Sequence, residues 1–180
     1  ALLLFAAFRR WPLLAASAAL LAVVIWHPFA PRVTPRALEL TAIDVGQGES
    51  LFLALPDGKL MLVDTGGIAA YGRSRRPALD IGEDVVSPYL WSRSIRRLDA
   101  VAITHNHDDH AAGLPAIVAN FRPRELWTPD RLKTGQEFGF GGARFEVLAA
   151  PGGEAKENND SLVLRVSYGR HSFLLTGDIE

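Results

Sequence analysis

A mostly apolar run that ends directly in a cluster of histidines and aspartates is the feature that most constrains this chain. Residues 98–104 (LDAVAIT) predict a strand buried on both faces. The next six residues, 105–110 (HNHDDH), contain three of the five histidines of the chain. Loops that follow the carboxyl ends of buried strands are where α/β proteins usually place their chemistry. We therefore expect the functional site at the end of this strand.

The spacing within the cluster favours metal binding. His105 and His107 lie two residues apart, so an extended or turning backbone can direct both imidazoles at one point. Asp109 and His110 open a predicted helix over 109–121 and can be directed at a second point nearby. Imidazole and carboxylate together suit zinc, manganese or iron, and two metals about 4 Å apart would lower the pKa of a water between them. A polar loop that caps a helix is the plainer alternative, but capping requires no histidine.

The remainder of the chain predicts one α/β domain built in layers. Periodic apolar residues predict a second helix over 83–94. Gly169-Arg170 predicts the turn of a final hairpin. Strands that come first and are then mixed with helices are typical of layered α/β domains. Besides 98–104, the predicted strands are 38–45, 49–55, 60–63, 126–127, 143–148, 161–168 and 172–176.

The first 30 residues have a different composition. Residues 11–26 are apolar and uncharged, and the run extended to Ala30 approaches the roughly 20 residues that cross a bilayer. Trp11 and Trp26 lie where interfacial aromatic residues are found. A buried helix or a signal peptide is the alternative. The expected organisation is one or more transmembrane segments over 1–30, a proline-rich linker over 31–37 and a single domain over 38–180.

Basic residues that flank the apolar run indicate its orientation. Arg9 and Arg10 precede it and favour the cytoplasmic side, which places the domain after Pro28 outside the cytoplasm. Arg32 and Arg36 on the other flank favour the opposite orientation. Arg9 and Arg10 therefore predict an extracytoplasmic domain, and Arg32 and Arg36 keep the opposite orientation open as the alternative.

The overall amino-acid composition excludes sites that depend on cysteine and indicates no particular binding partner. The formal net charge is −1, and the chain has no cysteine, so disulfides, thiolate metal sites and a cysteine nucleophile are excluded. Arginine is concentrated locally, and Arg73, Arg75 and Arg76 could contact a phosphate backbone, as could the clusters at 93–97 and 122–124. A solvated surface paired with nearby acidic residues is the alternative for all three clusters.

Three motifs resemble the metallo-β-lactamase superfamily. The stretch 105–110 matches its HxHxDH motif. Asp64, in VDTGG, resembles the aspartate that braces the metal loop, and Asp178, in LLTGD, resembles the bridging metal ligand. The resemblance implies an α/β fold of the αββα sandwich type, incomplete at its C-terminus here. The transmembrane helix that we expect before it is predicted by the apolar run over 11–30.

The same resemblance implies a role for each site residue. His105 and His107 would bind one divalent metal, Asp109 and His110 would bind a second, and Asp178 would bridge the two. Manganese or zinc would be the metals. Asp109 or Asp178 would orient the attacking water, which makes these two the expected catalytic residues.

One motif of the superfamily has no evident counterpart. A third histidine is expected before the bridging aspartate, but Asn158, Asn159 and Ser161 occupy that region. We expect Asn159 to lie beside the metal ligands and His171 to be a surface strand residue. The last ligand of the superfamily is expected beyond Glu180.

Longer stretches narrow the resemblance to the ComEC family, the membrane channel of bacterial DNA uptake in natural competence. Glu49 stands where that family usually has aspartate. The resemblance implies DNA, the membrane and the rest of the uptake machinery as partners, and a multi-pass protein of the bacterial cell membrane. It covers nearly all of 38–180 in order, through 42–50, 56–67, 85–90, 98–114, 158–164 and 173–180.

We interpret the domain as a metal-dependent phosphodiesterase that degrades the DNA strand that is not imported. Three alternatives remain open. They are a catalytically silent scaffold, a module that grips DNA without cutting it, and a small-molecule hydrolase such as a lactonase or lactamase. The missing third histidine favours the silent scaffold.

Overall fold

The structure is a computed structural model, and it describes residues 2–26, 29–69, 79–150 and 160–179. The chain divides into two compact units, 1–30 and 31–180. The first unit consists of helix α1 (Leu2–Trp26), which contains Pro12. No helix in the described part of the chain combines the length and the apolar character that a membrane span requires. The predicted transmembrane segment is therefore not shown by the structure.

The second unit contains a five-stranded sheet in the order β1-β2-β3-β4-β5. β1, β2 and β3 are antiparallel neighbours, whereas β3, β4 and β5 run parallel. The parallel pairing brings the carboxyl ends of β3 and β4 to the same edge of the sheet, where α/β proteins bind ligands. The strands are β1 (Glu39–Ala42), β2 (Leu51–Ala54), β3 (Leu60–Val63), β4 (Ala100–Ala102) and β5 (Glu125–Trp127).

A second sheet is antiparallel throughout, in the order β6-β7-β8-β9. Tyr168 pairs with His171 across the predicted Gly169-Arg170 turn. Every predicted strand is present, β3 with the predicted ends and the others with shifted, shortened or extended ends. β6 is an additional strand that the sequence did not predict. The strands are β6 (Glu137–Phe140), β7 (Ala143–Ala149), β8 (Val163–Tyr168) and β9 (His171–Leu175).

The described residues of this unit include four short helical segments. The predicted helix over 83–94 is confirmed as η1 (Gly82–Val86), a π-helical turn, followed by α2 (Ser87–Ser92). The single helix predicted over 109–121 is wrong, because the chain forms α3 (Asp108–Ala111) and then α4 (Leu114–Phe121). Pro115, in the first turn of α4, has no N–H to donate to a continuous helix, so the helix breaks before it.

The central strands of the first sheet, β2, β3 and β4, are buried on both faces, as predicted for the run 98–104. Leu51 and Leu53 of β2 face one apolar core, and Phe52 and Ala54 face the other. The first core joins this sheet to the second sheet, for example through Phe145. The other core joins it to the helices. Each fully buried leucine or phenylalanine contributes about 1.5–3 kcal/mol, so these two cores hold the layers together.

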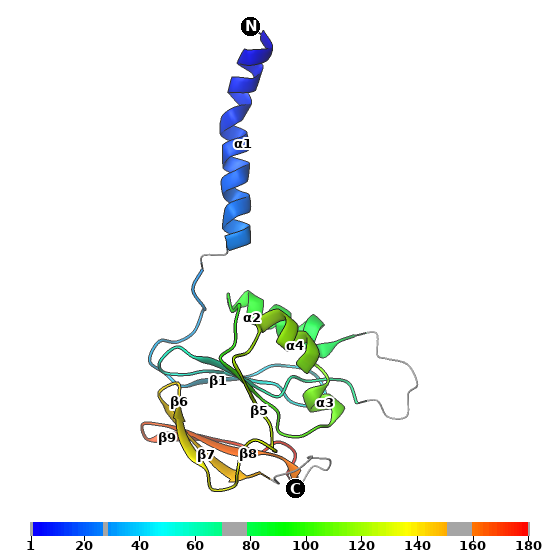
Figure 1. The fold of residues 1–180 in the computed structure, drawn as a ribbon, viewed down its shortest axis with the longest axis vertical. Coiled ribbons are helices and arrows are strands. Elements are labelled where there is room, and N and C mark those ends of the chain that lie inside the picture. The colour runs from blue at the N-terminus through cyan, green and yellow to red at the C-terminus, as the bar shows by residue number, and fades with distance from the viewer. Residues whose placement is uncertain (1, 27–28, 70–78, 151–159, 180) are drawn as a thin grey trace. The chain divides into compact units, whose positions relative to one another are not determined.

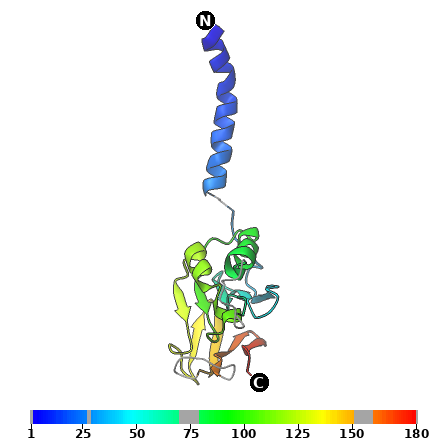
Figure 2. The same ribbon diagram turned by 90° about the vertical axis from the view of Figure 1, so that its right-hand side faces the viewer.

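The domain is therefore layered, with helices, a first sheet and a second sheet in that order (Figure 1). In Figure 2 the uppermost green helices and the orange-to-red strands again lie at opposite ends of this domain. The layered α/β architecture predicted from the sequence is confirmed. Three of the four layers of an αββα sandwich are present in the described ranges, which include no helix packed on the outer face of the second sheet.

A close backbone contact fixes the histidine loop against the first sheet. A Cβ atom at Gly67 would lie 1.8 Å from the carbonyl oxygen of Asp108 and 2.7 Å from the Cβ of Ala112. We expect Gly67→Ala to lower the free energy of unfolding by about 1–3 kcal/mol, because the backbone of α3 would have to move. Gly139→Ala is the control, since Gly139 is exposed in β6 with nothing within 4 Å of the added atom. Denaturant unfolding of both variants measures the difference, and equal stabilities would contradict it.

Candidate metal centre

The carboxylate of Asp64 organises the site. Asp64 follows β3, is fully buried, and has a left-handed backbone (φ 57°), which aspartate adopts more readily than most residues. Its carboxylate accepts hydrogen bonds from the backbone N–H of Thr104 at 2.8 Å and from the hydroxyl of Thr104 at 2.6 Å. His110 Nδ1 donates to the same carboxylate at 2.7 Å. One side chain therefore connects the end of β3 to both sides of the histidine cluster.

This network directs His105 toward the site. The hydroxyl of Thr104 donates to Asp64, so its oxygen accepts from His105 Nδ1, which lies 3.0 Å away. The other nitrogen of this fully buried ring, Nε2, is then left as the ligand atom. It lies 3.1 Å from His107 Nδ1. Two ligands of one tetrahedral metal at about 2.0–2.1 Å are roughly 3.3 Å apart, so this pair has the spacing of a single metal site.

His110 and Asp178 form a second pair with the same spacing. His110 is 1% exposed, and its Nδ1 is engaged by Asp64. Its Nε2 lies 3.2 Å from Asp178 Oδ1, but this contact lacks hydrogen-bond geometry, and Nε2 has no hydrogen-bond partner among the described residues. A buried imidazole nitrogen that faces a carboxylate without bonding to it fits a shared cation.

The two pairs adjoin one another. One ligand atom from each of His105, His110 and Asp178 lies within 4.8 Å of the others. The rings of His105 and His110 have centroids 4.2 Å apart. Imidazole and carboxylate donors at these separations fit two neighbouring divalent cations.

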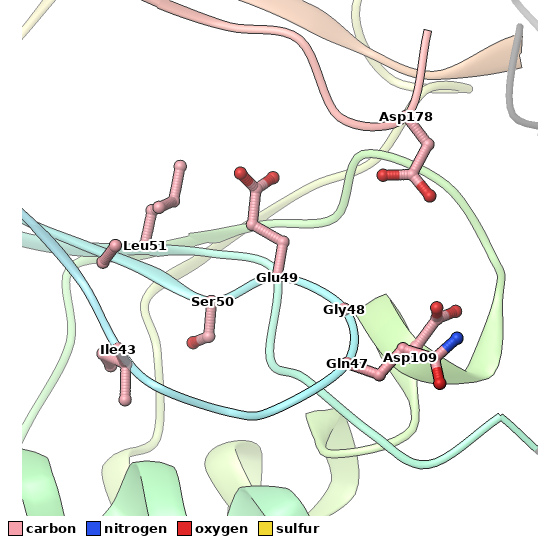
Figure 3. Close-up of a pocket in the computed structure, with 9 residues that line it drawn as sticks. Ile43, Gln47, Gly48, Glu49, Ser50, Leu51, Asp109 and Asp178 are labelled. Carbon is pink, nitrogen blue, oxygen red and sulfur yellow. The ribbon is translucent and has the colours of Figure 1, made fainter. Parts of the chain in front are cut away.

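A cavity of about 430 Å³ lies beside these ligands. Carboxyl groups from three separate segments surround it, those of Glu49, Asp109 and Asp178 (Figure 3). Gly48 lines it too, and a Cβ there would lie 2.1 Å from the carbonyl oxygen of Asp109, so the loop before β2 packs directly on α3. The cavity thus gives a ligand direct access to acidic side chains.

Charge and burial shift the pKa values of the site residues in opposite directions. Burial alone would lower the pKa of His110, but the hydrogen bond to Asp64 and the charges of Asp64, Asp178 and Asp109 raise it to about 9. Burial and the neighbouring His110 lower the pKa of His105. Burial, with the charges of Asp64 and Asp178, raises the pKa of Glu49 to about 7. The metal-free site therefore holds protons that a cation has to displace.

The structure brings most of the predicted site residues together. His105, His107, His110 and Asp178 converge, and Asp64 contacts His110. Asp109 lines the cavity but is not in the groups of converging ligand atoms among the described residues. The predicted Asn159, Arg73, Arg75 and Arg76 lie outside the described residues.

Two other predictions about side chains are resolved by their contacts. Arg93 forms an ion pair with Glu39, and Arg124 lies 3.6 Å from Asp99. These two arginines therefore agree with the alternative of a surface paired with nearby acidic residues. His171 is exposed in β9, which confirms its reading as a surface strand residue.

Sequence reasoning identified Asp64 but missed the other residues that contact the ligands. Ser161 is fully buried, with its hydroxyl oxygen 3.3 Å from His105 Nδ1, and it accepts from the backbone N–H of Asp178 at 3.4 Å. Thr104 and Glu49 were not identified as site residues either. Thr104 directly precedes the histidine motif, and Glu49 directly follows the glycine-rich loop at 46–48, at the position where the resemblance leads us to expect aspartate.

Comparison with known proteins agrees with this geometry. The family model described as "Metallo-beta-lactamase superfamily" matches residues 43–161. The chain belongs to this superfamily. A beta-lactamase from Chitinophaga pinensis has a similar fold, with a TM-score of 0.52 over 77% of this chain and 58% of that chain at 12% identity. The metallo-β-lactamase-like α/β fold expected from the sequence is thus confirmed.

Relatives of this chain include one protein named for the ComE operon and one named for competence. "ComE operon protein 3" of Bacillus subtilis is 29% identical over 79% of this chain and 22% of its own length. "Competence protein ComA" of Neisseria gonorrhoeae is 30% identical over 78% of this chain and 20% of its own length. These similarities are consistent with the ComEC-type resemblance. The chain spans about a fifth of the length of these two relatives.

The central role of Asp64 predicts a large effect of a small substitution. Asp64→Asn loses an acceptor for donors that remain buried, so we expect the free energy of unfolding to fall by about 2–4 kcal/mol. Asp57→Asn, in an exposed turn, should change it by less than about 1 kcal/mol. Urea unfolding of the two variants provides the comparison, and a near-neutral Asp64→Asn would refute the organising role.

Proton binding by His110 predicts how stability depends on pH without metal. The pKa of His110 in the fold, about 9, exceeds its ordinary value of 6.5, so its contribution is complete below pH 6.5 and is lost as pH rises through 9. We expect the unfolding free energy of the metal-free chain to fall by on the order of 3 kcal/mol between pH 6.5 and 9.5. His110→Gln should flatten this profile, and His171→Gln, at an exposed position, should retain it. Equal slopes in the two variants would contradict the assignment.

Proposed function

We propose that this domain is a two-metal phosphodiesterase that acts on DNA during uptake. Two short separations between ligand atoms, directly beside an acidic cavity, are the observation that carries the proposal. His105 Nε2 lies 3.1 Å from His107 Nδ1, and His110 Nε2 lies 3.2 Å from Asp178 Oδ1. Membership of the metallo-β-lactamase superfamily supports a metal-dependent hydrolase. Similarity to a protein named for competence supports a role in DNA uptake.

Each residue of the site would have a distinct task. His105 and His107 would hold one divalent cation, manganese or zinc, and His110 and Asp178 would hold the other. When bound, the cations would supply Lewis acidity and lower the pKa of a water. Asp109, at the cavity wall, would orient that water for in-line attack on phosphorus. Asp178 would bridge the two cations and keep them close together.

Indirect contacts would keep the ligands in place. Asp64 fixes the orientation of His110 directly and that of His105 through Thr104. Ser161 contacts His105 and the backbone of Asp178. Ligands that are held by hydrogen bonds need little rearrangement when a metal or a substrate binds.

Charge in the cavity supports a metal-dependent mode of DNA binding. Glu49, Asp109 and Asp178 line the cavity, and its described lining contains no lysine or arginine. Such a wall repels a phosphodiester unless cations are bound. Binding of DNA at this site should therefore depend on divalent metal.

We also propose a location from the resemblance and the relatives. The domain would belong to a multi-pass protein of the bacterial cell membrane, on its extracytoplasmic side, with DNA and the rest of the uptake machinery as partners. The apolar residues 11–26 and the similarity to competence proteins support this placement.

DNA cleavage by the full-length protein tests the proposed activity. Linear single-stranded and double-stranded DNA would be incubated with manganese, zinc or EDTA. We expect cleavage that requires metal and that falls about 100-fold or more in Asp109→Asn, because the substitution removes the base that orients water. Asp108→Asn is the matched control, since Asp108 is its neighbour in α3 and does not line the cavity.

Other outcomes would identify the alternatives. Metal bound at the site without cleavage under any condition would overturn the nuclease and favour a scaffold. Salt-sensitive DNA binding without cleavage would favour a module that grips DNA. Hydrolysis of a lactone or a β-lactam with intact DNA would favour a small-molecule hydrolase.

A further inference from the structure

Glu49 is a carboxyl group that the ligand set does not use. It lies in the loop that ends at β2, at the position where the resemblance led us to expect aspartate. The side chain is only partly exposed, and its Oε2 is buried with no hydrogen-bond partner among the described residues. Burying a carboxylate oxygen without a donor is costly, so such an atom calls for a cation or another partner at this place.

The neighbours of Glu49 are residues of the metal centre. One ligand atom from each of Glu49, Asp64 and His110 lies within 4.8 Å of the others. Glu49 and Asp178 line the same cavity from two separate segments (Figure 3). Because Asp64 already accepts three hydrogen bonds, it is not free to serve a cation. Glu49 is therefore the unused carboxylate beside His110.

His110 independently indicates a ligand at this point. It is 1% exposed, and its Nε2 has no hydrogen-bond partner within the described ranges. Asp64 holds the other nitrogen, so Nε2 is the atom directed at Asp178. Two buried polar atoms without partners, one on an imidazole and one on a carboxyl group, thus lie in the same small region.

Backbone contacts hold Glu49 in this position. Its carbonyl oxygen accepts a hydrogen bond from Gly66 N–H at 3.0 Å. The adjacent Ser50 donates its hydroxyl to the carbonyl oxygen of Asp64 at 3.1 Å. The loop is thus fastened on the Asp64 turn before any ligand arrives, which is the arrangement expected of a preorganised ligand.

We propose that Glu49 supplies a further carboxylate ligand to the cation held by His110 and Asp178. The inference rests on the proposed function, because it assumes that cations bind at this centre. It adds an oxygen donor to the side of the centre where His110 and Asp178 already lie. The four-atom reach of glutamate allows its carboxylate to enter the cavity from the loop before β2.

Metal titration of the purified full chain tests this role without measuring activity. Manganese and zinc would be titrated into wild type, Glu49→Gln, Glu49→Ala and Asp44→Asn, with bound metal counted by elemental analysis and affinities measured by calorimetry. We expect wild type to bind two ions and Glu49→Gln to retain one at unchanged affinity. In Glu49→Gln the affinity for the other ion should fall by about 10-fold to 100-fold. Asp44→Asn, an exposed carboxylate of the same loop, should match wild type.

The variants separate failure of this inference from failure of the proposed function. Two ions bound to Glu49→Gln at wild-type affinity would overturn the role of Glu49 and leave the two-metal centre standing. A wild-type chain that binds no divalent cation would overturn both. Circular dichroism would confirm that each variant folds. If Glu49→Gln does not fold, Glu49→Ala, titrated in the same way, decides, because it removes the carboxylate: a weakened second ion supports the inference and unchanged binding contradicts it.

Discussion

The rest of the site depends on one buried carboxylate. Asp64 is inaccessible to solvent, so its charge has to be matched by donors within the protein. Thr104 supplies two donors and His110 supplies the third. These hydrogen bonds determine which nitrogen of each imidazole is left for a metal. For His110 the effect is direct, and for His105 it passes through the hydroxyl of Thr104.

The fold brings Asp64 and its hydrogen-bond partners together. Parallel pairing of β3 with β4 brings Asp64 and Thr104, 40 residues apart in sequence, to one edge of the sheet. The absence of a side chain at Gly67 lets the histidine loop pack on the turn after β3. The second sheet is attached through an apolar core, and its last strand leads to Asp178. Packing therefore decides where the ligands meet, and hydrogen bonds decide how they are oriented.

Sequence patterns could predict the layered fold and the metal ligands more readily than the residues that hold these ligands in position. The apolar run 98–104 and the histidine motif that follows it are local sequence patterns, so they can be recognised in the sequence directly. The break between α3 and α4 was missed because apolar periodicity continues across Gly113, while the break reflects Pro115 and tertiary contacts. The roles of Ser161 and Glu49 arise from packing between distant segments. Both residues lie in stretches that carry the family resemblance, but those stretches assign neither of them a role beside the metal ligands.

The most direct test of the account is anomalous X-ray diffraction from crystals of the protein grown with manganese or zinc, measured at the absorption edge of the metal. The account predicts two neighbouring peaks. One would lie between His105 and His107, and the other between His110 and Asp178 with Glu49 in contact. A single peak outside these contacts, or no peak in a protein whose Asp64 network is intact, would contradict it.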